Sequence, residues 1–270
     1  MSSHRYMPDA AQLSVLTAVV LLAFALMHVL DPAPLPVQIP LGGIALEFNL
    51  RLSAAVTILT AILAAAGVDW LLRSHPSIQP GETMEHWLLP MVTVLILGIT
   101  LNTLPGGATW WLGFGLGAVL LVMVFLSEYV VVDPADVRYP LATAALTVLA
   151  FIMFLILAVA LQAAQARLFL LVPTLFLGGG FVALRTLHLR LNERWEFAWA
   201  VGIGIVGAQL GAALHYWPLT PVRFGLILLG PLYALTVLAV GLAEGNPFRR
   251  AVVEPAVMLA LLWGLAILFH

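Results

Sequence analysis

Residues 140–161 read PLATAALTVLAFIMFLILAVAL and contain no charged side chain. A hydrocarbon core about 30 Å thick is crossed by roughly 20 apolar residues of α-helix, so this stretch is long enough to span a bilayer. Lipid offers the backbone no hydrogen-bond partners, and apolar runs of this length therefore form helices. Eight further apolar runs lie at 11–30, 52–72, 86–103, 109–131, 168–187, 197–216, 222–242 and 252–269. The sequence predicts an all-α, polytopic integral membrane bundle of about nine transmembrane helices.

The composition agrees with a membrane protein. Hydrophobic residues make up 63% of the chain, against about 45–50% in soluble domains. Charged residues make up 9%, against about 25%. We therefore expect residues 1–270 to form a single transmembrane domain with the lipid bilayer as its main partner. The net charge of -2 gives no reason to expect a nucleic-acid partner.

Two residue types are missing from the chain, and their absence limits its chemistry. Without cysteine there are no disulfides, thiol nucleophiles or cysteine-ligated metals. All 11 basic residues are arginines, so no lysine can carry a retinal Schiff base. The seven histidines form no HxxxH pair, and the sequence predicts neither a metal site nor a cofactor.

The arginines indicate an orientation, because cytoplasmic loops are enriched in basic residues. With the N-terminus inside, the cytoplasmic arginines are 5, 73, 138, 185, 190, 194, 249 and 250, and the outer ones are 51, 167 and 223. This bias predicts a multi-pass protein of the prokaryotic inner membrane with a cytoplasmic N-terminus. Nine spans then place the C-terminus on the extracytoplasmic side.

The segment 32–51 alternates apolar and polar residues on either side of Gly42 and Gly43. This pattern is typical of a β-hairpin with a two-residue turn. We expect a short extracytoplasmic hairpin whose apolar face lies on the membrane surface or on the helices.

Four ionisable residues lie toward the predicted cytoplasmic ends of three spans. They are Asp69, Glu128, Arg185 and His188, with Ser127, Tyr129, His86 and Arg73 as supporting members. Ionisable residues at membrane depth are rare and usually face the bundle interior. The preferred pair within this candidate intramembrane polar cluster is Glu128 with Arg185. The alternative is that these side chains anchor helix ends at the interface or act as structural ion pairs.

Other motifs favour helix packing. Thr57 and Thr60 lie on a small, weakly polar stripe of the second span, and Gly207 and Gly211 form a small-xxx-small pair in the seventh. Prolines at 90, 173 and 231 fall inside spans and should kink them and free backbone carbonyls.

Several short strings resemble an uncharacterised multi-pass bacterial membrane-protein family. They are Gly67-Val68-Asp69-Trp70 followed by Arg73, His75 and Pro76; His86 with Pro90; and Glu128-Tyr129 followed by Asp133. The strings cover the first half of the chain. The resemblance implies a shared membrane fold and no known activity or catalytic residues.

Three functions remain open on the sequence alone. The first is a non-catalytic membrane component: a structural, assembly or sensing subunit that contacts lipid, another membrane protein or a second copy. The second is a carrier for a small solute, ion or lipid that uses the polar cluster. The third is an intramembrane enzyme acting on a lipid with Glu128 or His188 as general base. No nucleophile, metal set or phosphate clamp accompanies those two residues, so the enzyme ranks last.

Overall fold

A computed structural model describes residues 7–30, 35–41, 44–50, 52–78, 83–191 and 194–269. The chain divides into two compact units, Met1–Ala142 and Thr143–His270. Helices make up most of both units, and one strand pair belongs to the first. The expectation of a single transmembrane domain over residues 1–270 stays a prediction.

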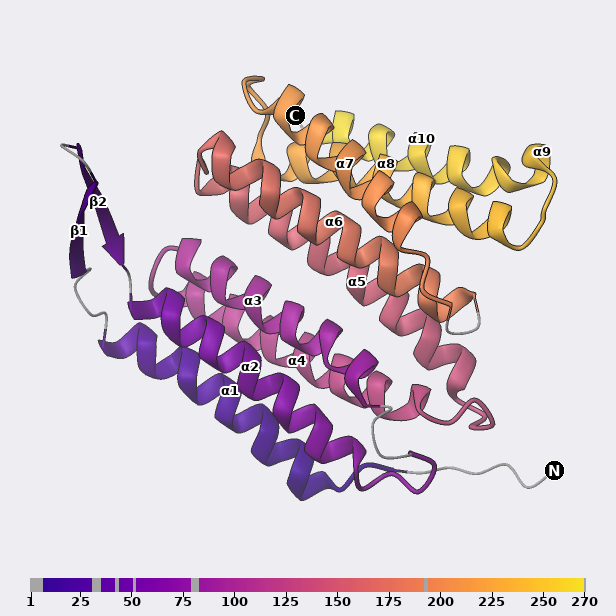
Figure 1. Cartoon of the computed structure of the whole chain (residues 1–270), viewed down its shortest axis with the longest axis horizontal. Helices are drawn as coiled ribbons and strands as arrows, with labels where there is room; N and C mark the ends of the chain where they lie inside the picture. Colours follow the sequence, from indigo (N-terminus) through magenta and orange to yellow (C-terminus); the bar gives the residue numbers. More distant parts are fainter. Residues whose placement is uncertain are drawn as a thin grey trace. The chain divides into compact units, whose positions relative to one another are not determined.

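The first unit is a bundle of four long helices. Its helices are α1 Ala10–Leu30, α2 Leu52–Leu72, α3 Leu88–Thr103 and α4 Ala108–Val131, with a 3-10 turn η1 Met84–His86 before α3. Both α2 and α4 pack against α1 and α3 (Figure 1). Apolar side chains from α1, α2 and α4, such as Val20, Leu71 and Phe125, are fully buried or nearly so in its core. Figure 1 shows the four helices running alongside one another.

Two strands connect α1 to α2. They are β1 Leu35–Leu41 and β2 Ile44–Leu50, which pair antiparallel with Leu35 opposite Leu50 and Leu41 opposite Ile44. The expected turn at residues 42–43 lies outside the described residues. The expected apolar face of the hairpin depends on side chains that are also outside the described part of the structure. The extracytoplasmic position of this segment stays a prediction.

The second unit contains the remaining helices. They are α5 Tyr139–Ala163, whose first four residues belong to the first unit, α6 Leu168–Arg190, α7 Phe197–Leu214, α8 Pro221–Ala243, the short α9 Phe248–Ala251 and α10 Val253–Leu268. Helix α6 packs against α7 and α8, and α10 packs against α8 (Figure 1). Thr220 caps the start of α8, since its side chain accepts the N–H of Arg223 at 3.4 Å. Pro221 then supplies a first helical position that needs no N–H.

Pro231 interrupts the hydrogen bonds of α8, and α10 supplies a replacement. A proline has no N–H to give the carbonyl four residues earlier, which here belongs to Ile227. Trp263 of α10 donates its indole N–H to that carbonyl oxygen at 3.2 Å. Gly230 leaves room for the indole, because a Cβ there would lie 3.1 Å from it. The proline break is thus part of the contact between α8 and α10.

Glycines set the close approach of α6 and α7. A Cβ at Gly204 would lie 2.7 Å from the carbonyl oxygen of Phe176 and 3.2 Å from the Cα of Gly180, so the two backbones nearly touch. A Cβ at Gly211 would meet a leucine of α6. At Gly207, by contrast, no neighbour from the described part of the chain comes within 4 Å of that position. The backbones therefore approach at Gly204, a position that the small-xxx-small pattern did not select.

Thr57 and Thr60 satisfy their hydroxyls within α2. They donate to the carbonyls of Ser53 and Val56 at 2.8 and 2.7 Å. The methyl group of Thr57 lies where a Cβ on Gly98 of α3 would be. This stripe therefore packs α2 against α3 through its apolar atoms.

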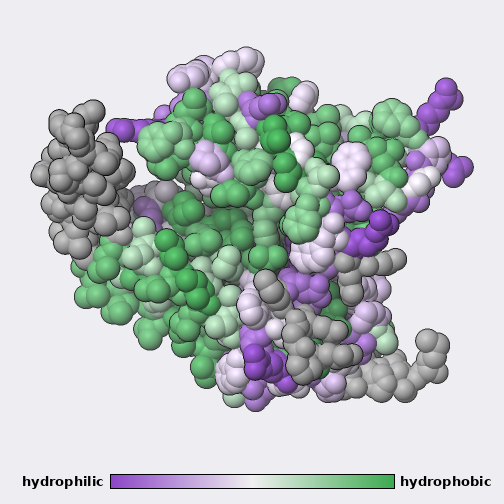
Figure 2. Space-filling model, viewed as in Figure 1, coloured by the Kyte–Doolittle hydropathy of each residue, from purple (hydrophilic) through white to green (hydrophobic). Residues whose placement is uncertain are grey.

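The chain is a helical, multi-pass membrane protein. Eight described helices are long and apolar enough to cross a bilayer. Large apolar side chains such as Leu112, Leu177 and Ile267 are exposed on them, as expected for surfaces that face lipid. Figure 2 shows hydrophobic residues over much of the visible surface, with hydrophilic ones gathered toward helix ends.

The remaining expected span, α3, is shorter. Its 16 residues extend about 24 Å at 1.5 Å per residue, less than the hydrocarbon thickness of about 30 Å. Length therefore supports eight crossings, and a ninth through α3 stays a prediction.

Candidate functional site

A histidine and a glutamate form the centre of the polar end of the first unit. Glu128 lies near the end of α4, and His86 ends η1 immediately before α3. His86 Nδ1 and Glu128 Oε2 are 2.7 Å apart, with side-chain exposures of only 7% and 0%. His86 Nε2 lies 3.6 Å from Glu85 Oε1. The imidazole therefore lies between two carboxylates.

Asp69 connects the end of α2 to the segment that precedes η1. One carboxylate oxygen accepts the hydroxyl of Thr83 at 2.5 Å, and the other contacts Arg73 Nε at 2.7 Å. Arg73 is largely exposed, so this ion pair adds little stability in water. The part-buried contact with Thr83 is the one that positions the chain. Residues 83–86 are thus held by carboxylates from both α2 and α4.

His75 is a buried histidine in the segment after α2, only 4% exposed. Its ring contacts the Tyr129 ring edge-on, with centroids 4.8 Å apart. Its Nδ1 accepts the backbone N–H of Ser77 at 3.2 Å. Burial lowers the pKa of His75, although the nearby carboxylates of Asp133 and Asp136 oppose the shift. The surroundings favour a neutral ring.

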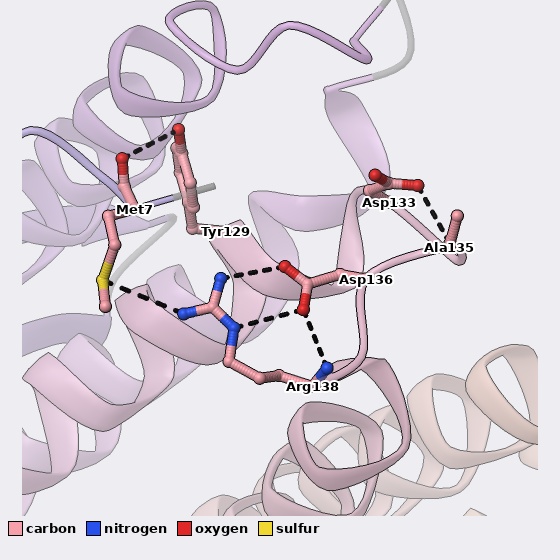
Figure 3. Close-up of polar contacts among 6 residues, drawn as sticks. All are labelled: Met7, Tyr129, Asp133, Ala135, Asp136 and Arg138. Atoms are coloured by element: carbon pink, nitrogen blue, oxygen red, sulfur yellow. Dashed lines mark hydrogen bonds and ion pairs between the residues drawn. The ribbon is translucent and has the colours of Figure 1, made fainter. Parts of the chain in front are cut away.

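The loop between α4 and α5 closes this end of the unit (Figure 3). Asp136 accepts the backbone N–H of Arg138 at 2.7 Å and its guanidinium at 2.8 and 3.1 Å. These hydrogen bonds raise the pKa of Arg138 above its ordinary value. Asp133 accepts the N–H of Ala135 at 2.9 Å, which shapes the preceding turn.

The end of α4 and this loop together hold the segment that leads into α1. The Tyr129 hydroxyl donates to the Met7 carbonyl oxygen at 3.4 Å, and Arg138 Nη1 lies 3.8 Å from the Met7 sulfur (Figure 3). The start of α1 and the end of α4 therefore lie at one end of the unit.

The structure brings together one part of the expected cluster. In the first unit, the residues at this polar end are Asp69, Arg73, His86, Ser127, Glu128 and Tyr129. Arg185 and His188 are buried on α6 of the second unit, where the His188 ring stacks on Trp195 at 4.1 Å. The pairing of Glu128 with Arg185 therefore stays a prediction. The contact that the structure does give Glu128 is with His86, expected only as a supporting residue.

Sequence reasoning missed His75, Thr83 and Asp136 as members of the polar end. All three are almost fully buried yet lie between helices, where hydropathy gives no signal of burial. For His75, a local signal was present in the strings that carried the family resemblance. Within the described ranges, no group of three histidine or acidic side chains is arranged to hold a metal ion.

Comparison with known proteins gives a family and no activity. The family model described as "Protein of unknown function (DUF5656)" matches residues 32–269. No curated protein and no solved structure matches significantly. The expectation of an uncharacterised family is confirmed.

Proposed function

This chain belongs to DUF5656, a family of proteins of unknown function, and we propose that it is a non-catalytic membrane component that senses protonation. The sensing element is the buried pair of His86 and Glu128. The observation that supports it best is their 2.7 Å contact with almost no solvent exposure. Ionisable groups in a membrane bundle are costly, and a functional role is the default hypothesis for them.

The chemistry of the pair suits a sensor. Imidazole is the side chain that ordinarily changes charge between about pH 5 and 8. A buried carboxylate depends on its partner, since breaking a buried ion pair costs about 3–5 kcal/mol. Glu128 from α4, Glu85 from η1 and His75 from the segment after α2 all act electrostatically on His86. A change in protonation therefore alters how firmly His86 is held.

The pair also links protonation to the segment that precedes α3. Residues 83–87 are attached to α4 through His86 and to α2 through Thr83. If the contact between His86 and Glu128 is lost, the segment loses its attachment to α4 and keeps the one between Thr83 and Asp69 of α2. The segment could then rearrange and offer a different surface to a partner protein.

Hydrogen exchange of residues 83–87, corrected for the intrinsic effect of pH, tests the proposal in lipid nanodiscs. We expect exchange in this segment to change between pH 7.5 and 5.5 in the wild type and to lose that response in Glu128→Gln. Ser127→Ala, at the neighbouring buried position, is the matched control and should keep the response. A wild-type segment that responds to neither pH nor Glu128→Gln would contradict a sensing role.

A carrier is the second candidate, favoured by the carboxylate of Glu128 with 0% exposure inside a helical bundle. Buried acids of this kind mark proton and cation pathways. Proteoliposomes with an internal pH dye would show proton flux above empty vesicles, and Glu128→Gln would abolish it. Flux equal to empty vesicles, together with a pH-dependent segment 83–87, would favour the sensor.

We also place the protein in the prokaryotic inner membrane with its N-terminus in the cytoplasm and its C-terminus outside. The arginine bias supports this orientation. The contacts of Met7 with Tyr129 and Arg138 agree with it, because they bring the start of α1 and the end of α4 to one end of the unit.

A further inference from the structure

A groove of about 410 Å³ lies between α6 and α7 of the second unit. It is lined by Val172, Pro173, Phe176, Ile205, Ala208, Gln209 and Ala212. Gln209 is the one polar side chain among these lining residues, and it is exposed. The groove is therefore an apolar surface with a single amide in it.

The amide lies within the candidate membrane span Phe197–Leu214. Helix α7 ends at Leu214, so Gln209 is about 8 Å inside that end at 1.5 Å per residue. An amide that finds no hydrogen-bond partner in an apolar medium costs several kcal/mol, in the range of about 2–7. An acyl chain in the groove cannot supply a partner. The occupant that satisfies Gln209 must carry a donor or an acceptor at the same depth.

Pro173 adds a second acceptor beside the groove. It offers no N–H to the carbonyl of Phe169 four residues earlier. Within the same unit, the equivalent carbonyl before Pro231 is covered by a neighbouring helix through Trp263. A helix docked at the groove could donate a hydrogen bond to the Phe169 carbonyl of α6, as Trp263 of α10 does to the Ile227 carbonyl of α8.

We propose that the occupant is a second copy of this chain, docked through α7 about a two-fold axis. A glutamine amide is both donor and acceptor, so the same side chain from two copies is self-complementary, as a two-fold interface requires. Polar amides hydrogen-bond membrane helices to each other, and small residues let the helices approach. Ala208, Ala212 and the open position at Gly202 provide such small residues along α7.

Disulfide cross-linking in native membranes tests this interface directly, because the chain has no cysteine of its own. We expect Ile205→Cys to form a covalent dimer of this chain on mild oxidation. Leu265→Cys on α10 is the control, since it is 45% exposed against 44% for Ile205 and should stay monomeric. Equal cross-linking at both positions, or none at Ile205, would overturn the proposal.

The amide itself is tested by the dimer fraction in nanodiscs, counted by single-molecule photobleaching. We expect Gln209→Leu to weaken association by roughly threefold to twentyfold, the range for hydrogen bonds between membrane helices. Thr174→Val is the control, because the Thr174 hydroxyl already donates within α6 to Leu170 at 2.7 Å. A wild type that stays monomeric as lipid is reduced would refute self-association. Cross-linking of Ile205→Cys to a different protein would replace the second copy with that partner.

Discussion

His75 makes the stability of the protein depend on pH. Because burial lowers its pKa below the usual 6.5, the folded protein resists protonating it while the unfolded chain does not. Its contribution is fully present above about pH 6.5 and is lost as the pH falls from there through the folded-state pKa. We expect the thermal midpoint to fall by a few degrees between pH 7.5 and 5.5.

The matched variant for this pH effect is His75→Asn. Its side-chain oxygen can accept the N–H of Ser77 in place of Nδ1, and it does not titrate. Thermal unfolding in nanodiscs should show a shallower pH dependence for this variant than for the wild type. An unchanged slope would mean that another group governs acid stability.

Coupling between side chains distinguishes the observed partner of Glu128 from the expected one. We expect Glu128→Gln and His86→Asn to be non-additive in unfolding free energy, with a coupling of about 0.5–3 kcal/mol as for residues in contact. A parallel cycle of Glu128→Gln with Arg185→Gln measures the pairing predicted from sequence. If the effects of Glu128→Gln and His86→Asn on the unfolding free energy were additive, the two residues would not interact, and the proposed sensor would be contradicted.

For individual residues, the sequence was enough to identify the ionisable side chains in the spans but not to predict which residues they contact. Glu128 stood out because a charge in an apolar run is rare. His86 lies at the border of its span, so hydropathy alone gave it no priority over Arg185. Thr83 and Asp136 are buried because of the path that their loops take. Hydrophobic periodicity does not predict the path of a loop.

The pairing of α8 with α10 depends on a proline break and the donor that compensates for it. Replacing Trp263 by Phe removes the donor to Ile227, and a backbone carbonyl left without a partner in an apolar medium costs about 1–3 kcal/mol. Pro231→Ala restores an N–H within α8, so the same Trp263→Phe change should cost much less in that background. Thermal unfolding of the four proteins measures this, with Trp199→Phe on α7 as control. Equal costs in both backgrounds would show that the indole acts through packing alone.

Helix boundaries were predicted well because the change from apolar to polar residues is sharp in a membrane protein. Span 52–72 coincides with α2 Leu52–Leu72, and span 168–187 falls within α6 Leu168–Arg190. The last span, expected at 252–269, corresponds to α10 Val253–Leu268, and the short helix α9 Phe248–Ala251 before it was not predicted. The close contact at Gly204 was not predicted, because a glycine pattern does not say which face meets a neighbour.

For the whole molecule, the crossing of α3 decides the orientation of everything that follows. The contacts of α3 support a crossing: His86 before its start meets Glu128 late on α4, and its far end lies near Gly113 early on α4. Those two points are about 22 Å apart along α4 at 1.5 Å per residue. A helix that follows its neighbour over that distance traverses most of the bilayer.

Labelling of single cysteines with an impermeant maleimide in spheroplasts tests this topology. We expect Gly106→Cys, between α3 and α4, to react from outside. Ser77→Cys and Gly245→Cys should react only after permeabilisation, which also serves as the control for their reactivity. If Gly106 and Ser77 behaved alike, α3 would not cross, and every later helix would have the opposite orientation.

The bond between Trp263 and Ile227 also has a consequence for biosynthesis. The two residues are 36 positions apart, so at about 5–20 residues per second the ribosome makes Trp263 a few seconds after Ile227. Until then, α8 presents a carbonyl that its own backbone does not satisfy. During that interval, a translocon or insertase that shields α8 from lipid would keep this carbonyl out of the apolar medium. The short connection through α9 keeps the interval brief.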